Sequence, residues 1–215
     1  MNKILFLLLT SFLSINSYAN CGDIKENQDF VLFKPKAENT VFHINDKEIT
    51  IIEFFNYFCP HCYRTQVYID TLKEKLNKEQ IKYNFIKIPA VFSKKWEDSA
   101  RTFYTFESLN DKKIEDKLFS SFTSGKNIGE DEQKIKEFAN NNGLDGEKYK
   151  SIYKSFTVDS KTKNAIIYTK NYQIASTPSF IINNKYVVNG NIAQNYQQMA
   201  DRVEKIVKYL TCTNK

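Results

Sequence analysis

The feature that most constrains the fold is a strand, a helix and a second strand in close succession over residues 49–88. Residues 49–55 (ITIIEFF) are β-branched and aromatic except for one acid, a composition typical of a buried central strand. Residues 60–76 show helical spacing, and Pro60 lies in the first turn, where its missing N–H is tolerated. Residues 81–88 alternate as a second strand. This order predicts a parallel strand pair with a right-handed crossover.

The rest of the chain extends this unit with helices and then a short hairpin. Helical spacing recurs in blocks near residues 95–109, 113–122, 131–140, 147–155 and 158–171. Two apolar runs, 179–182 and 185–188, flank Asn183-Asn184, a pair that suits a tight turn because Asn tolerates positive φ. Residues 192–210 carry one apolar stripe and predict a closing helix.

The predicted fold class is therefore α/β, a thioredoxin-like fold with an inserted helical subdomain. The thioredoxin-like domain is expected at residues 20–93 and 172–215, and the insertion at 94–171. Hydrophobic residues make up 41% of the chain, enough to fill a core of this size.

The N-terminal residues predict export. Lys3 precedes an apolar run over residues 4–15, and the small residues Ser17 and Ala19 follow it. This pattern is typical of a secretory signal peptide at residues 1–19, cleaved after Ala19. The run is too short to cross a bilayer, which needs roughly 20 apolar residues. We expect a soluble mature protein in the periplasm.

A lipoprotein is the alternative, with Cys21 as the residue that carries the lipid. It is less favoured, because the residue before Cys21 is the polar Asn20 instead of a small one. The net charge of +6 falls to +5 when the signal peptide is removed, and its lysines and acids are interspersed. With only three arginines in the chain, a nucleic-acid partner is poorly supported.

Cys59 and Cys62 lie at the turn from the first strand into the helix. The Cys59 sulfur is thereby placed at the helix N-terminus, where free N–H groups and the helix dipole stabilise a thiolate. We expect the pKa of Cys59 to lie below that of a free cysteine. His61 can add to this if it is protonated or donates a hydrogen bond towards the sulfur. In a Cys59–Cys62 disulfide, Cys59 is the attacked sulfur and Cys62 the resolving thiol.

A C-x-x-C pair can also be half of a zinc site or a static structural disulfide. The remaining candidate ligands, His43, His61, Cys21 and Cys212, show no spacing typical of a zinc site. His43 is expected to be structural or exposed. A disulfide that closes so short a loop would restrict the unfolded chain only slightly and would therefore add little stability. The position of the motif in an exported chain favours redox chemistry with no bound cofactor or metal.

Residues 53–63 (EFFNYFCPHCY) resemble the active-site segment of the DsbA family, periplasmic thiol:disulfide oxidoreductases of the thioredoxin superfamily. The resemblance extends to residues 176–180 (STPSF) and 183–186 (NNKY). Its specific part is Pro60-His61, because related reductases and isomerases usually carry other residues there. The resemblance implies an enzyme that oxidises cysteine pairs in exported proteins and is reoxidised by a quinone-linked membrane partner of the DsbB type.

The resemblance also implies a cis bond between Thr177 and Pro178, packed against the disulfide. There the Thr177 backbone would pair with an extended substrate peptide, and its side chain would tune the redox potential. A proline that opens a strand is in any case unexpected unless its missing N–H faces an edge or a gap.

The resemblance places one acid, Glu53, beneath the active site, where it helps to move protons to and from Cys62. An unpaired carboxylate in an otherwise apolar strand would be costly, which also points to a role. The family often has a second acid in the active-site helix, and this chain has the neutral Gln66 at that position. We therefore expect a weaker network of charged residues beneath the site.

Cys21 and Cys212 lie near opposite ends of the predicted mature chain. If Cys59 pairs with Cys62, an oxidising compartment favours a structural disulfide between the remaining two. We state this pairing as a hypothesis.

The leading interpretation is a monomeric protein dithiol oxidase. One alternative is a disulfide isomerase or reductase of the same superfamily, but isomerases typically add an N-terminal dimerisation domain, for which residues 20–48 are too short. Another alternative is a chaperone module that binds unfolded clients and carries a structural disulfide. The reduction potential of the cysteine pair separates an oxidase from a reductase.

Overall fold

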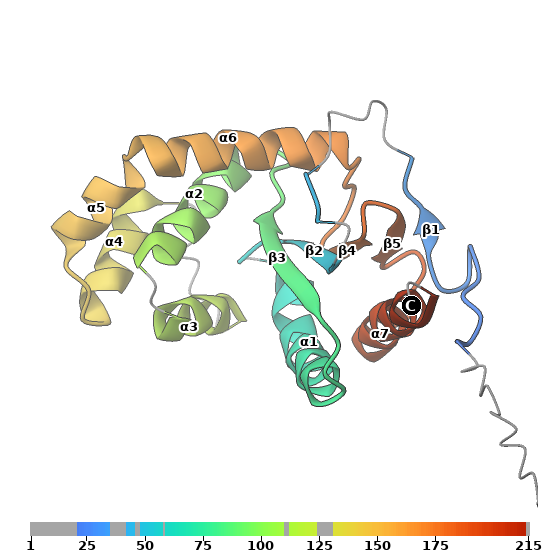
Figure 1. Ribbon diagram of the computed structural model, residues 1–215. Coiled ribbons are helices and arrows are strands. Elements are labelled where there is room, and N and C mark those ends of the chain that lie inside the picture. The colour runs from blue at the N-terminus through green and yellow to red at the C-terminus, as the bar shows by residue number, and fades with distance from the viewer. Residues whose placement is uncertain are drawn as a thin grey trace, which may run out of the picture.

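The computed structural model describes residues 21–34, 42–45, 48–57, 59–109, 112–123 and 131–213. The predicted signal peptide and its cleavage site lie outside the described residues. Five strands form one sheet in the order β1-β5-β4-β2-β3, and helices lie on both of its faces (Figure 1). The strands are β1 (Val31–Leu32), β2 (Ile49–Phe55), β3 (Tyr83–Pro89), β4 (Ser179–Ile182) and β5 (Tyr186–Asn189).

Strand β2 lies between two partners and is buried along its whole length. It pairs in parallel with β3, so that Glu53 lies opposite Lys87. It pairs antiparallel with β4, where Glu53 lies opposite Phe180. Both faces of β2 are covered, which explains why its sequence is a nearly continuous apolar run instead of an alternating one. The predicted parallel pair is present.

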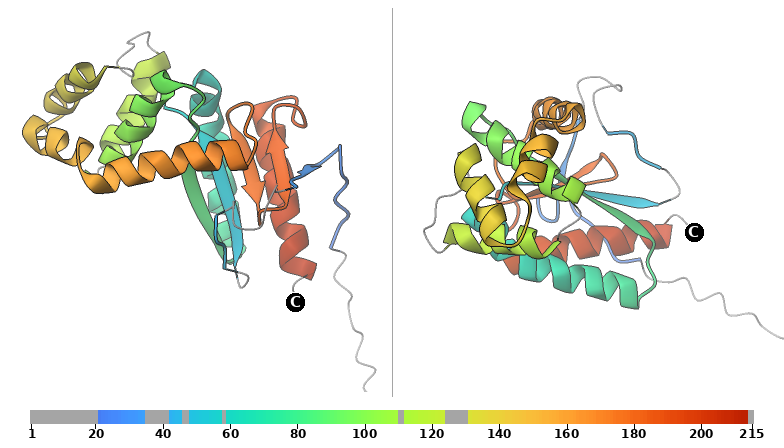
Figure 2. Two further views of the ribbon diagram at one scale, coloured as in Figure 1. Left: turned by 90° about the horizontal axis from the view of Figure 1, so that it is seen from above. Right: turned by 90° about the vertical axis from the view of Figure 1, so that its left-hand side faces the viewer.

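Two long helices, α1 (Pro60–Lys78) and α7 (Tyr196–Thr213), run side by side on one face of the sheet (Figures 1 and 2). Their apolar stripes share a core cluster with the strands. On the outside, Lys75 and Glu204 form an ion pair at 3.0 Å, and Lys208 and Glu79 form another at 2.7 Å. These pairs favour one alignment of α7 along α1, but they add little to the free energy of unfolding because they are exposed.

A run of helices connects β3 to β4: α2 (Lys94–Leu109), α3 (Lys112–Thr123), α4 (Glu132–Asn141), α5 (Gly146–Tyr153) and α6 (Phe156–Asn171). Three of them begin at residues that cap the helix N-terminus with a side-chain oxygen: Asp131, Asp145 and Ser155. Helix α6 crosses the sheet face opposite α1 and α7 (Figure 2). The helical blocks predicted between residues 95 and 171 are thus present, within a few residues at each end. The proposed domain boundaries stay a prediction.

Two predicted boundaries are wrong, for local reasons. The closing helix begins at Tyr196 instead of residue 192, because the N–H groups of Ile192 and Ala193 bond to the Asn189 carbonyl in a turn. The last strand is displaced by one residue, to Tyr186–Asn189. Asn183 and Asn184 form the turn before it, with φ of 48° and 51°. The two-residue strand β1, which pairs with β5, was not predicted.

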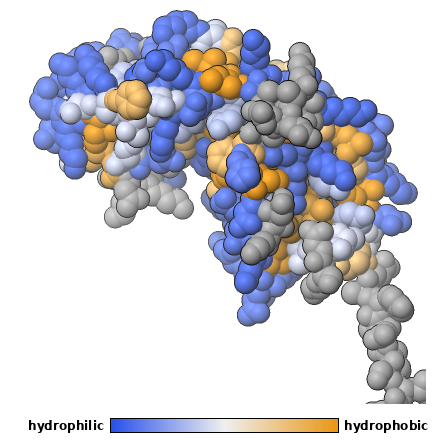
Figure 3. Space-filling model, turned by 45° about the horizontal axis from the view of Figure 1, so that its top comes forward, coloured by the Kyte–Doolittle hydropathy of each residue, from blue (hydrophilic) through white to orange (hydrophobic). Residues whose placement is uncertain are grey.

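The surface is mixed in character. Figure 3 shows hydrophilic residues over most of one face, with hydrophobic patches between them. Within the described ranges, no helix combines the length and the apolar character that a membrane span requires.

Candidate active site

Cys59 is the N-cap residue of α1, and Pro60 is the first residue of the helix. The Cys59 sulfur accepts a hydrogen bond from the backbone N–H of Cys62 at 3.4 Å, as an N-cap side chain does. Both cysteines are free thiols here. Cys59 retains 7% of its surface accessible, whereas Cys62 is fully buried one turn into the helix. An incoming sulfur can therefore reach Cys59 and not Cys62.

The pKa of Cys59 is lowered to about 6. The largest cause is a hydrogen bond from the Cys62 thiol, which outweighs the opposing effect of burial. Hydrogen bonds from the Thr177 hydroxyl and from the backbone N–H groups of Cys62 and His61 lower the pKa further. The thiolate form of Cys59 therefore predominates at neutral pH.

The pKa of Cys62 is raised well above its ordinary value. Burial is the main cause, and the neighbouring Cys59 and the carboxylate of Glu53 act in the same direction. The two sulfurs thus differ in their protonation state: one is a thiolate near neutral pH, and the other holds its proton.

The Thr177–Pro178 peptide bond is cis and lies immediately before β4. The Cys59 thiol lies 3.5 Å from the Thr177 carbonyl oxygen, to which it donates when protonated. Pro178 itself is buried. The loop therefore places one backbone carbonyl and one hydroxyl beside the reactive sulfur.

His61 is exposed, and its ring contacts the last helix. The Nδ1 atom lies 2.8 Å from the hydroxyl of Tyr196, the first residue of α7. His61 contributes to the lowered pKa of Cys59 through its backbone N–H, whose effect is smaller than that of the Cys62 thiol. Sequence analysis did not find Tyr196, because it lies 135 residues from His61 and belongs to no motif.

Glu53 is fully buried in β2. Its Oε1 atom accepts a hydrogen bond from the Gln66 amide at 3.1 Å, and Lys87 lies opposite it on β3. The Lys87 ammonium also lies over the Phe55 ring, 4.3 Å from its centroid. Gln66, where a second acid was expected from the resemblance, thus supplies a neutral donor to Glu53. The acid and the amide both lie close to Cys62, since the Glu53 charge acts on its pKa and the Gln66 amide lies 3.5 Å from its carbonyl oxygen.

A groove of about 500 Å³ opens beside the motif. Its lining joins three parts of the site: the helix start at His61, the cis-proline loop at Thr177 and Pro178, and the start of α7 at Tyr196 and Met199. The turn between β5 and α7, at Gly190, also lines the groove. A groove of this size beside the reactive sulfur can hold a short extended segment of another chain.

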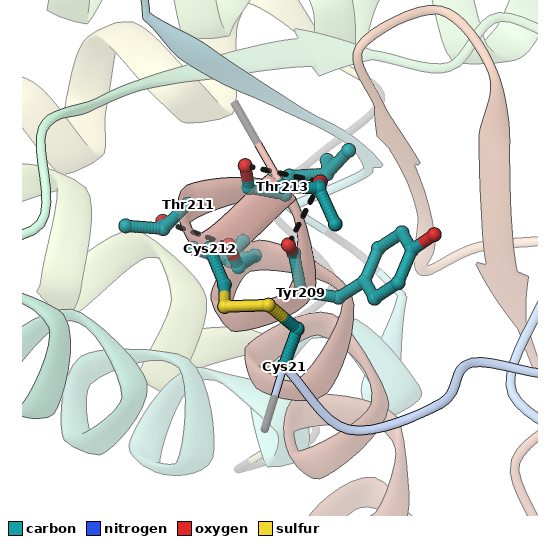
Figure 4. The surroundings of a disulfide bond; sticks show 7 residues. Cys21, Tyr209, Thr211, Cys212 and Thr213 are labelled. Atoms are coloured by element: carbon teal, nitrogen blue, oxygen red, sulfur yellow. Dashed lines mark hydrogen bonds between the residues drawn. A yellow bond between two sulfur atoms is a disulfide. The ribbon is translucent and has the colours of Figure 1, made fainter. Parts of the chain in front are cut away.

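The remaining predicted residues lie away from this site. Cys21 and Cys212 form a disulfide between the N-terminal segment and the end of α7 (Figure 4). His43 is exposed. Among the described residues, no three His, Cys, Asp or Glu side chains are grouped as ligands of a metal ion.

Residues 64–204 match the family described as a DSBA-like thioredoxin domain, which is more than half of the chain. The chain belongs to this family. The thiol:disulfide interchange protein DsbA of Pseudomonas syringae pv. tomato is 29% identical over 140 residues, which cover 65% of this chain and 64% of that protein. The protein of the same name from Pseudomonas aeruginosa is 26% identical over 185 residues, 84% of each chain.

Solved DsbA structures share the fold. The crystal structure of Pseudomonas aeruginosa DsbA superposes with a TM-score of 0.75 at 24% identity, and covers 87% of this chain and 95% of that one. The oxidoreductase NmDsbA1 from Neisseria meningitidis gives 0.73 at 17% identity, with 88% and 95% covered. The predicted fold class is confirmed. The family match begins at residue 64, so the roles of Cys59 and Cys62 depend on the geometry described above.

Proposed function

We propose that this member of the DsbA family is a thiol:disulfide oxidoreductase that oxidises cysteine pairs in exported proteins. The observation that carries the proposal is the unequal setting of the two sulfurs. Cys59 keeps 7% of its surface exposed and has a pKa of about 6, whereas Cys62 is fully buried and its pKa is raised. A well-stabilised Cys59 thiolate is a good leaving group and favours the reduced form of the pair, so the disulfide form is oxidising.

The reaction begins with the Cys59–Cys62 disulfide. A client thiolate attacks the Cys59 sulfur, the bond to Cys62 breaks, and Cys62 leaves with the electron pair and takes up a proton. A second client thiolate then attacks the client sulfur of the mixed disulfide, and Cys59 leaves as a thiolate. The client loses two thiol protons and two electrons. The cysteine pair gains the two electrons and one proton, and the other proton goes to solvent.

Client binding follows from the groove beside Cys59. The backbone at Thr177 is next to the reactive sulfur, and the groove continues towards Gly190 and Tyr196. We expect an extended client segment to bind there mainly through its backbone, which gives affinity with little sequence preference. Such binding suits an enzyme that meets many partly folded chains. The groove is also where a reoxidising partner would have to approach Cys59.

The periplasm is the proposed compartment. The signal peptide predicted at residues 1–19 supports it, as does the Cys21–Cys212 disulfide, because structural disulfides persist in oxidising compartments. A quinone-linked membrane protein of the DsbB type is the proposed acceptor of the electrons that Cys59 and Cys62 collect. The Cys59 thiolate would attack a disulfide of that partner and displace one of its sulfurs as a thiolate. Cys62 would then attack Cys59 in the mixed disulfide, which restores the Cys59–Cys62 disulfide and leaves the partner with two reduced cysteines.

Stoichiometric transfer to a reduced dithiol peptide tests the activity. Oxidised protein, mixed with the peptide at pH 7 without other oxidants, should yield one peptide disulfide per protein and a reduced Cys59–Cys62 pair. A Cys59→Ser variant should yield none. If the reduced protein instead reduces an oxidised peptide and the reverse transfer does not occur, the protein is a reductase. If neither transfer occurs, the pair is structural.

A further inference from the structure

We propose that Tyr196 is a positioning residue for the redox pair: its hydroxyl anchors the His61 imidazole to α7 and so fixes one of the two residues between the cysteines. This inference rests on the proposed function and adds a residue that no part of the motif contains. Nδ1 of His61 lies 2.8 Å from the Tyr196 hydroxyl oxygen, within the range of a good hydrogen bond.

The anchor is rigid because Tyr196 begins a long packed helix. Its ring is half-buried, and the next residues of the apolar stripe, Met199 and Ala200, are buried in the core shared with α1. Further along, the ion pair of Lys75 and Glu204 holds the same two helices together at 3.0 Å. The hydroxyl of Tyr196 is therefore held at a defined place relative to the start of α1.

The His61 ring needs such an anchor because the residue is otherwise exposed. Its backbone N–H is one of the groups that stabilise the Cys59 thiolate, and the direction of that N–H depends on the conformation of His61. Without the contact to Tyr196, the His61 ring would be free to rotate in solvent. The first turn of α1 would then sample conformations in which the N–H is less well directed at the sulfur.

The same contact shapes the client groove. His61 and Tyr196 both line it, together with the Thr177–Pro178 loop. A hydrogen bond between them joins α1 to α7 at this part of the groove. The anchor thus acts on the redox pair, through His61, and on the groove at once.

Tyr196→Phe removes the hydroxyl and keeps the ring. We expect the pKa of Cys59 to be higher in this variant than in the wild type. The thiolate absorbance of the reduced protein, recorded as a function of pH, measures this pKa. The equilibrium constant with glutathione should shift about twofold to tenfold towards a less oxidising pair, the effect of one hydrogen bond. Tyr68→Phe is the matched control, because the Tyr68 ring lies 6.5 Å from the Tyr196 ring and is also half-buried. It should leave both quantities unchanged.

Two further measurements separate positioning from a general loss of structure. In a His61→Ala background, Tyr196→Phe should have no additional effect on the glutathione constant. Imidazole ¹⁵N shifts can be recorded on the folded wild-type protein, and the chain has only two histidines, so His61 is easily distinguished from His43. Its Nδ1 shift should report a hydrogen bond, and the shift of the exposed His43 should not.

The proposal is overturned if Tyr196→Phe leaves the pKa of Cys59 and the glutathione constant at wild-type values, or if it has the same effect with and without His61. A wild-type His61 spectrum identical to that of a free imidazole would also overturn it. These results are distinct from failure of the proposed function, which would appear as no disulfide transfer by the wild-type protein.

Discussion

The sulfur of Cys59 lies 3.5 Å from the carbonyl oxygen of Thr177, 118 residues further along the chain. This contact joins the start of α1 to the cis-proline loop that opens β4. Neither segment alone makes a reactive sulfur with a place for a client beside it. Their juxtaposition brings both together, because the helix start stabilises the thiolate while the loop places the Thr177 carbonyl next to it.

Replacing Thr177 by Val should make the pair less oxidising. The Thr177 hydroxyl is one of the groups that lower the pKa of Cys59, and Val keeps the shape of the side chain without it. We expect a higher pKa for Cys59 and an equilibrium constant with glutathione about twofold to tenfold less oxidising. Thr71→Val, on the exposed side of α1, is the control and should change neither. An unchanged constant in Thr177→Val would show that the hydroxyl does not act on the sulfur.

The stability of the reduced protein should rise with pH through the neutral range. Cys59 ionises near pH 6 when folded, against an ordinary value of 9.0. Between these values the unfolded chain binds more protons, so the free energy of unfolding increases with pH, by about 2 kcal/mol from pH 6 to pH 8. The contribution is lost as the pH falls through 6. Urea unfolding gives the free energy of unfolding of the reduced wild-type protein and of the Cys59→Ser variant. The difference between the two, recorded across this pH range, measures the contribution of Cys59. A difference that stays constant with pH would contradict the lowered pKa.

Glu53→Gln should lower the pKa of Cys62. Burial is the main cause of the raised pKa, but the negative charge of Glu53 adds to it, and Gln removes that charge. Titration of the reduced protein by ¹³C NMR of labelled cysteine follows Cys62 separately from Cys59. Glu48→Gln is the control, since Glu48 is exposed just before the same strand. If both variants titrate like the wild type, the carboxylate of Glu53 does not act on Cys62.

Removing the Cys21–Cys212 disulfide should reduce stability and leave the redox pair unchanged. The disulfide joins residues 191 apart in sequence, so it restricts the unfolded chain strongly. A Cys21→Ser, Cys212→Ser double variant should lose about 2 to 5 kcal/mol in free energy of unfolding. Its glutathione equilibrium constant should equal that of the wild type, because Cys212 lies near the end of α7 and Tyr196 is the first residue of that helix. A large change in that constant would reveal a coupling that the structure does not show.

The central elements of the fold could be predicted from local pattern. Residues 49–55 are apolar on both faces, which placed β2 inside the sheet, and the helical spacing that begins at Pro60 placed Cys59 at a helix start. Asn183-Asn184 identified a turn because few other residues tolerate positive φ. The start of α7 was misplaced, since the apolar spacing continues through Ile192 into a turn that only its bonds to Asn189 reveal.

The site could be predicted only in part, because some of its contacts join distant segments without a sequence signal. Cys59 and Cys62 carry their own spacing. Tyr196 carries none, and its contact with His61 depends on how α7 packs against α1. For Gln66, the sequence likewise indicates only that an acid common in the family is missing, and it indicates no partner for the amide. The Gln66 amide reaches Glu53 because α1 packs against β2.

The reduction potential of the Cys59–Cys62 pair, measured by equilibration with glutathione at pH 7, tests the central claim most directly. The account predicts a potential well above the value of thioredoxin, about −270 mV, because a thiolate with a pKa of about 6 stabilises the reduced form. A potential at or below that of thioredoxin would contradict it, and would assign this pair to the reduction of disulfides instead of their formation.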